Sequence, residues 1–154
     1  MTDIRKILVP VDFSDGASVA LELAASFAKT FGASVELLHV WTPPLMVPIP
    51  IVVVTPRSDQ PLSLEELAST TASAQMKDLV EQLRKQGIET QARVGIGSPA
   101  HEIVELATLG HFDLIVMGTH GHGGLAHALL GSVAEKVVRR ASCPVLTVRA
   151  PKSK

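Results

Sequence analysis

The stretch DLIVMGTHGHGGLAHALLGSVAEKVVRRA, residues 113–141, holds the pattern that decides the fold. Its first five residues are mostly apolar, as in a strand that is buried on both faces of a sheet. A loop with five glycines and three histidines, but no lysine or arginine, follows at 118–132. The run VAEKVVRRA then has the character of a helix. This order is typical of a strand–loop–helix unit in a parallel sheet.

Outward from this stretch, strand-like and helix-like segments alternate along the chain. Short runs rich in apolar and β-branched residues predict strands at 5–11, 34–40, 88–94, 113–117 and 144–149. We expect the strand at 88–94 to lie at an edge, because it alternates only weakly. Helix-like segments between the strands predict four helices, the last from about Ser132 to Ala141. The first three have the expected capping or terminating residues: Ser14 and Gly32, Gly87, and Ser98 with Pro99.

The alternation predicts an α/β fold, an open and mostly parallel sheet with helices on both faces. Ligands of such sheets bind outside the carboxyl ends of the strands, where the strand order reverses. If the strands at 5–11 and 113–117 are neighbours at that point, the site lies between residues 10–12 and residues 117–118.

Length and composition indicate one ordinary globular domain over residues 1–154. The chain is 46% hydrophobic and 19% charged, with a formal net charge of −1. This balance gives no electrostatic reason to expect a nucleic-acid partner. One cysteine, Cys143, excludes an internal disulfide framework and suits a reducing compartment, and no secretory signal is visible. We therefore expect a cytoplasmic protein.

The segment 41–62 is proline-rich and apolar, and we expect it to be an irregular insert. Between Glu36 and Arg57 the chain has no charged residue, a length that could span a bilayer. Five prolines lie inside this interval and would break a helix, so we predict no membrane span. Within this segment, the ten uncharged and mostly apolar residues 45–54 need cover, either as a lid on a ligand or against a second subunit.

The glycine loop has the features of a phosphate site that needs no cationic side chain. A loop between a parallel strand and a helix presents free backbone N–H groups and the positive end of the helix dipole. Glycine lets the backbone approach an anion closely, and Ser132 adds a hydroxyl at the helix start. The alternative is that the glycines only form a tight turn. The loop is neither a Walker A motif nor a G-x-G-x-x-G fingerprint.

Three motifs in order resemble the universal stress protein family, in its ATP-binding branch. They are ILVPVDFSD at 7–15, G-x2-G-x9-G-S at 118–132, and GSVAEKVVRRASCPVLTVR at 131–149. The resemblance covers nearly the whole chain except the insert, which matches a variable loop of the family. It implies an open five-stranded parallel sheet in strand order 3-2-1-4-5, a Rossmann-like arrangement.

The resemblance also implies the residues of an adenine-nucleotide site. Asp12 matches a carboxylate near the nucleoside, Val40 a position on the adenine, and Met117 a position close to the ribose and base. The other matching positions line the pocket or hold ribose and phosphates: Pro10, Val11, Gly118, Gly121, Gly131, Ser132 and Val133. Read alone, Asp12 is equally well a turn or cap residue, and Val40 and Met117 are core residues.

One departure from the family concerns charge. His122 and His127 stand where many relatives place arginine or another polar residue, and no lysine or arginine occurs from Asp113 to Ala134. Phosphate charge is then expected to rest on backbone amides, the helix end, these histidines and a divalent cation. The implied ligand is ATP, or else ADP or AMP, with Mg²⁺ or Mn²⁺ held through the phosphates. The implied partner is a second copy, paired through the strand at 144–149.

Other chemistries are less well supported. The three loop histidines, His120, His122 and His127, have poor spacing for a rigid metal site. Ser132 lacks the G-x-S-x-G elbow of a serine hydrolase. The resemblance to the family implies a nucleotide-dependent regulator of stress tolerance, and we expect slow hydrolysis at most. Two alternatives stay open: an ATP hydrolase or phosphotransferase, and a nucleotide-free homodimeric interaction module.

Overall fold

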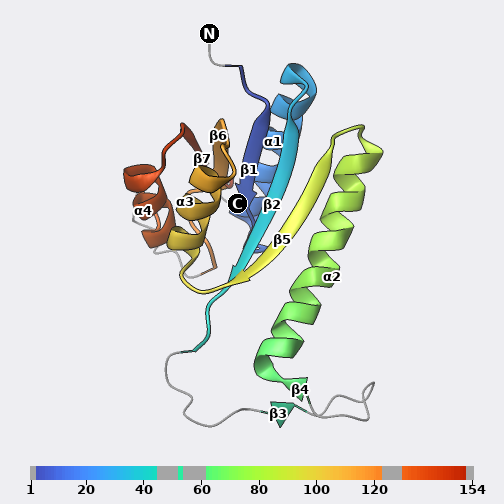
Figure 1. Cartoon of the computed structure of the whole chain (residues 1–154), viewed down its shortest axis with the longest axis vertical. Coiled ribbons are helices and arrows are strands. Elements are labelled where there is room, and N and C mark those ends of the chain that lie inside the picture. The colour runs from blue at the N-terminus through green and yellow to red at the C-terminus, as the bar shows by residue number, and fades with distance from the viewer. Residues whose placement is uncertain (1–2, 45–51, 54–61, 123–129, 152–154) are drawn as a thin grey trace.

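The computed structural model describes residues 3–44, 52–53, 62–122 and 130–151. Along the chain the elements are β1 (Lys6–Pro10), α1 (Asp15–Phe31), β2 (Ser34–Trp41), β3 (Val52–Val53), β4 (Leu62–Ser63), α2 (Leu64–Lys85), β5 (Thr90–Ile96), α3 (Pro99–Leu109), β6 (Leu114–Gly118), α4 (Ser132–Arg140) and β7 (Val145–Val148) (Figure 1). Strands and helices alternate in the order that the sequence predicts. Among the described residues, no helix is both long enough and apolar enough to span a bilayer.

The main sheet has five parallel strands in the order β5-β2-β1-β6-β7. Numbered along the chain, its strands run 3-2-1-4-5, so the predicted fold class and strand order are confirmed. The expectation that the third strand, now β5, lies at an edge is also confirmed. The strand order reverses between β1 and β6, which pair through Ile7 with Leu114 and Leu8 with Ile115.

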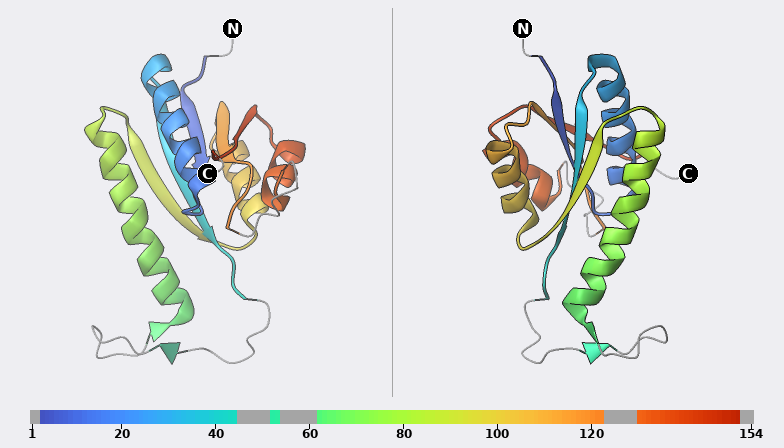
Figure 2. Two further views of the ribbon diagram at one scale, coloured as in Figure 1. Left: turned by 180° about the vertical axis from the view of Figure 1, so that it is seen from behind. Right: turned by 45° about the vertical axis from the view of Figure 1, so that its right-hand side comes forward.

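Helices cover both faces of this sheet, α1 and α2 on one side and α3 and α4 on the other (Figure 2). Alternate residues of the central strands divide between the two layers, as their pleat requires. Ile7 and Val9 of β1 pack with α1 and α2, whereas Leu8 between them packs with α3 and α4. Because both faces are covered, β1 and β6 are apolar almost throughout.

Local capping chemistry sets most of the helix ends. Ser14 accepts a hydrogen bond from Ala17 N at the start of α1, and Gly32 takes the left-handed conformation at its end, with φ of 68°. Ser63 and Glu66 form a reciprocal capping box at the start of α2. At α3, Pro99 occupies the first turn, but the Ser98 side chain makes no capping hydrogen bond.

The segment 41–62 is not wholly irregular, which corrects the prediction. Trp41 continues β2, because β5 extends far enough to pair with it through Ile96. Val52–Val53 and Leu62–Ser63 form a two-stranded antiparallel sheet beside the first turns of α2 (Figure 1). Residues 45–51 and 54–61 lie outside the described residues, so the expected role of the insert as lid or subunit contact remains a prediction.

Candidate functional site

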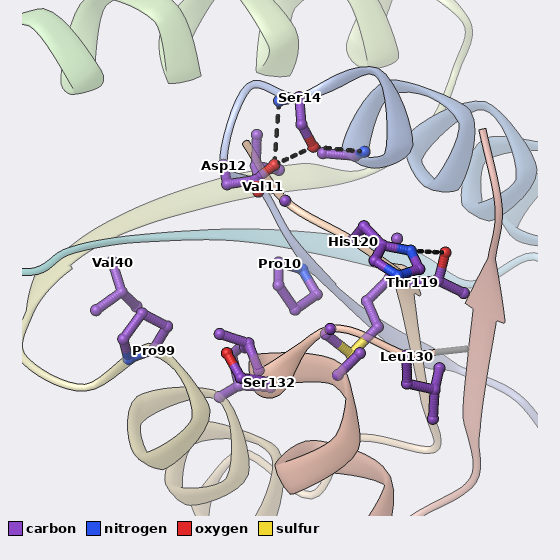
Figure 3. Close-up of a pocket in the computed structure, with 18 of the residues that line it drawn as sticks. Pro10, Val11, Asp12, Ser14, Val40, Pro99, Thr119, His120, Leu130 and Ser132 are labelled. Carbon is purple, nitrogen blue, oxygen red and sulfur yellow. Dashed lines mark hydrogen bonds between the residues drawn. The ribbon is translucent and has the colours of Figure 1, made fainter. Parts of the chain in front are cut away.

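A cavity of about 530 Å³ lies at the carboxyl edge of the sheet, where β1 and β6 end (Figure 3). This is the point of strand-order reversal, where ligands of open α/β sheets bind. Ten of the eleven residues predicted for the site line the cavity: Pro10, Val11, Asp12, Val40, Met117, Gly118, Gly121, Gly131, Ser132 and Val133. The structure thus brings together four segments that are far apart in the sequence.

The loop after β1 carries Asp12 to the cavity and also begins α1. Asp12 Oδ1 accepts hydrogen bonds from the backbone N–H of Ser14, at 3.0 Å, and from the Ser14 hydroxyl (Figure 3). The same hydroxyl oxygen accepts from Ala17 N at 3.3 Å, as a helix N-cap does. Asp12 therefore has both features that the sequence suggests: it is a turn residue before α1, and its carboxylate lines the cavity.

Phe13, between Asp12 and Ser14, has a φ of 62°, which is unusual for a residue other than glycine. Its ring packs against the ring of His39, with 4.8 Å between the centroids. The His39 Nδ1 lies 2.7 Å from the carbonyl oxygen of Val11, which only accepts, so this nitrogen is the donor. His39 thus holds the β1–α1 loop in place from β2.

Glycine is required by close approach at the end of β6. A Cβ atom on Gly118 would lie 2.9 Å from the carbonyl carbon of Gly16 in the first turn of α1. A Cβ on Gly121 would overlap Oδ2 of Asp12. Both contacts let the β6 loop run directly against the β1–α1 loop beside the cavity.

The start of α4 supplies the polar wall of the cavity. Gly131 is the N-cap residue and, as a glycine, contributes no side-chain capping bond; its own N–H donates to the carbonyl oxygen of Thr119 at 2.6 Å. The first-turn N–H groups of an α-helix have no partner within the helix. Ser132, Val133 and Ala134 of that turn line the cavity. These groups and the helix dipole favour an anion there.

A second part of the cavity lining, from β2, α3 and β6, is apolar. Leu38 and Val40 of β2, Pro99 and Ile103 of α3, and Met117 of β6 contribute it. Such a surface suits the planar, weakly polar face of a ring system rather than a charged group.

The charged groups at the cavity are mainly acidic. Asp12 and Glu135 line it, and Glu135 pairs with Arg139 one turn further along α4, at 2.7 Å. No lysine or arginine occurs among the described lining residues. An anionic ligand therefore meets backbone N–H groups in place of cationic side chains.

His122, the eleventh predicted residue, lies at the rim and not in the lining. Its Nε2 is 2.9 Å from the carbonyl oxygen of Asp12, and its side chain is exposed. His120 does line the cavity, with its Nδ1 3.0 Å from the Thr119 hydroxyl (Figure 3). His127 lies outside the described residues. Within the described part of the chain, the one His and acidic cluster close enough for a metal is on α3, at His101, Glu102 and Glu105.

Several lining residues escaped the sequence analysis. Gly16 does not line the cavity itself, but it packs on Gly118, which does. It directly follows the ILVPVDFSD motif, and its close approach is evident only once the β6 loop is placed beside it. Pro99 and Ile103 look like ordinary residues of a helix that starts after Ser98. Thr119 and His120 lie inside the glycine loop, between two predicted residues, and could have been included on that ground.

Cys143 is a partly buried residue that packs in the α3–α4 layer. Partial burial raises the pKa of its thiol, and the negative charge of Asp113 raises it further. The thiol is therefore largely protonated near neutral pH and is a poor nucleophile there. It is also absent from the lining of the cavity.

Fold and cavity together define an α/β protein with a cavity at the switch point of a parallel sheet. The chain belongs to the universal stress protein family, whose model matches residues 3–149. Universal stress protein MJ0531 of Methanocaldococcus jannaschii is 37% identical over 148 residues, which are 96% of this chain and 84% of that protein.

Solved structures of the family have the same fold. The structure of MJ0577, from the same archaeon, matches with a TM-score of 0.80 and 28% identity over 98% of this chain and 99% of that one. A universal stress protein of Archaeoglobus fulgidus, solved in complex with dAMP, matches with a TM-score of 0.63 and 25% identity over 96% and 98% of the two chains. An adenine nucleotide is thus a ligand of that relative.

Proposed function

We propose that this protein binds an adenine nucleotide, ATP with Mg²⁺ or Mn²⁺, in the cavity between β1 and β6. The observation that carries the proposal is that one cavity is lined both by apolar side chains and by the polar first turn of α4. Apolar side chains of β2, α3 and β6 suit a purine ring, and the first turn of α4 suits phosphate. The dAMP complex of the Archaeoglobus fulgidus relative supports the choice of adenine.

In this proposal each predicted residue has a part in binding. Val40 packs on the base, Met117 lies by the ribose and base, and Asp12 is near the nucleoside. Pro10 and Val11 form the wall beside it. The phosphates lie along backbone groups of the glycine loop and the start of α4, which belong to Gly118, Gly121, Gly131, Ser132 and Val133. His122 is close to the phosphates at the rim.

A divalent cation fits the charge balance of this site. Triphosphate would bring several negative charges to a cavity that Asp12 and Glu135 already line. The chain has no lysine or arginine from Asp113 to Ala134 that could offset them. Mg²⁺ keeps several waters and joins such sites through phosphate oxygens, so it would shield this charge without a set of protein ligands.

We infer a regulatory rather than a rapidly catalytic role in stress tolerance. The sequence has no Walker A lysine, and catalysis of phosphoryl transfer depends on positioned charge around the phosphates. Slow hydrolysis is therefore the most we expect. Phosphate release well above background, lost in Asp12→Ala, would instead favour a hydrolase or phosphotransferase. Failure to bind any nucleotide would favour the interaction module.

Two measurements test nucleotide binding directly. Mass spectrometry of the small molecules released on denaturation should detect an adenine nucleotide in the purified protein. After exhaustive dialysis, ATP with Mg²⁺ should raise the melting temperature. At a ligand concentration one hundred times the Kd, binding adds about 2.7 kcal/mol to the free energy of unfolding. An unchanged melting curve at millimolar ATP and at millimolar AMP would contradict the proposal.

We further propose that this single-domain chain acts in the cytoplasm as a homodimer paired through β7. The strand is at an edge of the main sheet, so one side of it has no partner strand in the described structure. Its residues Val145, Leu146, Thr147 and Val148 are all only partly buried. An edge strand of this composition is a natural site for pairing with a second copy.

A further inference from the structure

His122 lies where the loop after β6 meets the loop after β1. Its Nε2 is 2.9 Å from the carbonyl oxygen of Asp12. A carbonyl oxygen only accepts hydrogen bonds, so Nε2 carries the hydrogen in the neutral ring. The unprotonated nitrogen is then Nδ1, and a proton taken up by the ring is added there. Protonation therefore keeps the bond to Asp12 and gives the ring a positive charge and a second donor.

A positive charge on His122 would matter because few cationic side chains are available near the cavity in the described structure. Among the described lining residues, the titratable ones are Asp12 after β1, His120 after β6 and Glu135 in the first turn of α4, and Asp15 lies beside them in the first turn of α1. Three of these four are carboxylates, and only His120 can become cationic. Since no described lining residue is a lysine or arginine, the histidines are the cationic side chains that the described rim can offer a phosphate.

The position of His122 next to Gly121 brings it toward the ligand. Gly121 lines the cavity and touches the Asp12 carboxylate, and His122 follows it directly. The hydrogen bond to Asp12 keeps the imidazole at this rim instead of leaving it free in solvent.

We propose that His122 is a titratable phosphate partner, so that nucleotide affinity rises as the pH falls through the neutral range. This inference rests on the proposed nucleotide site and names a form of its regulation. A bound phosphate favours the protonated ring, so the complex holds more protons than the free protein. By linkage, binding tightens as the pH is lowered. A ligand without phosphate gains nothing from the charge.

The experiment compares wild type, His122→Gln and His122→Lys from about pH 5.5 to about pH 8.5, the range in which histidine changes charge. Calorimetric titration gives the Kd of AMP, of ATP and of adenosine for each protein. His122→Gln keeps a side-chain donor but stays neutral, and His122→Lys stays charged. The ligand and the rest of the chain are the same in all three proteins, so a ratio of Kd values isolates the contribution of His122.

For whichever of AMP and ATP binds more tightly, we expect the Kd of wild type to be about fivefold lower than that of His122→Gln at the acid end of the range. A factor of about five is the effect of an ion pair at an exposed position. The two proteins should bind alike at the alkaline end. His122→Lys should keep the advantage throughout, and adenosine should show no difference among the three.

Two results would overturn the inference while leaving nucleotide binding intact. One is a ratio of Kd values that does not change with pH, because a structural contact would lower affinity equally at every pH. The other is the same pH-dependent ratio for adenosine, which would assign the effect to the bond with Asp12. If neither AMP nor ATP binds wild type at any pH, the proposed function itself fails.

Discussion

Asp12 and Gly121 are in contact where the loops after β1 and β6 meet, at a point where a Cβ atom would overlap the carboxylate. Oδ2 of Asp12 faces Gly121, while Oδ1 accepts two hydrogen bonds from Ser14. The carboxylate is therefore fixed on one side by the start of α1 and on the other by the β6 loop. This contact couples the shape of the cavity to the conformation of both loops.

Replacing Gly121 tests this coupling. In Gly121→Val the new side chain must displace Asp12 or the loop, and either movement changes the cavity wall. We expect the ATP-dependent rise in melting temperature to disappear, while the protein without ligand stays folded. Differential scanning fluorimetry with and without ATP and Mg²⁺ measures both. A full ATP shift in Gly121→Val would contradict the proposed place of the ligand.

Gly118 tests the packing behind the cavity. Its Cβ would lie 2.9 Å from the Gly16 carbonyl carbon, and backbone atoms cannot give way as the end of a side chain can. We expect Gly118→Ala to lower the free energy of unfolding by about 1–3 kcal/mol, as overpacking does. Gly95→Ala in β5 is the matched control, because its nearest neighbours would be 3.9 Å away. Urea denaturation of the two variants should separate them clearly.

Ser14 tests the link between the α1 cap and the site. Ser14→Ala removes the acceptor for Ala17 N and one of the two bonds to Asp12. We expect a loss of about 1 kcal/mol in the free energy of unfolding, the usual value of an N-cap serine. We also expect weaker ATP binding, since Asp12 is then less well held. Ser73→Ala, at an exposed position within α2, should be neutral or slightly stabilising.

The sequence was sufficient for the fold because its local signals agree with one another. Apolar runs, capping serines and glycine stops mark the same boundaries, so each long element was predicted with the right type. The strand ends were less accurate. β5 begins at Thr90 and ends at Ile96, two residues later at each end than predicted, because pairing with β2 sets its limits. That pairing joins residues more than fifty positions apart and leaves no mark in a local pattern.

The candidate site was predictable where a motif carried it and not where packing did. Asp12, Gly118 and Gly131 belong to motifs and were named in advance. Leu38 and Ile103 also line the cavity, yet any buried apolar residue of a strand or helix looks like them in sequence. His122 was placed among the binding residues, but its ring direction follows from a bond to a carbonyl 110 positions away.

The capping box of α2 predicts a contribution to stability that depends on pH. Hydrogen bonds from the backbone N–H and the hydroxyl of Ser63 lower the pKa of the Glu66 carboxyl. A carboxyl whose pKa is lower in the folded state stabilises the fold above its unfolded pKa, and loses this effect as the pH falls through the folded value. We expect Glu66→Gln to be less stable than wild type at neutral pH. The difference should shrink as the pH falls below the unfolded pKa of glutamate, about 4.3, and vanish below the lower folded pKa, as measured by urea denaturation across pH.

The register of β7 allows a sharp test of the homodimer. The carbonyl oxygens of Pro144 and Val148 accept from Ile115 N and Thr119 N of β6, so residues at 144, 146 and 148 face that strand. By alternation, the backbone groups of Val145 and Thr147 face outward. Thr147→Pro removes one outward donor and spares the bonds to β6, whereas Thr147→Val keeps the donor. We expect the proline variant to weaken dimerisation about tenfold or more, since symmetry removes two hydrogen bonds. Sedimentation velocity over a concentration series measures this, and equal dimerisation of wild type and Thr147→Pro would exclude pairing through β7.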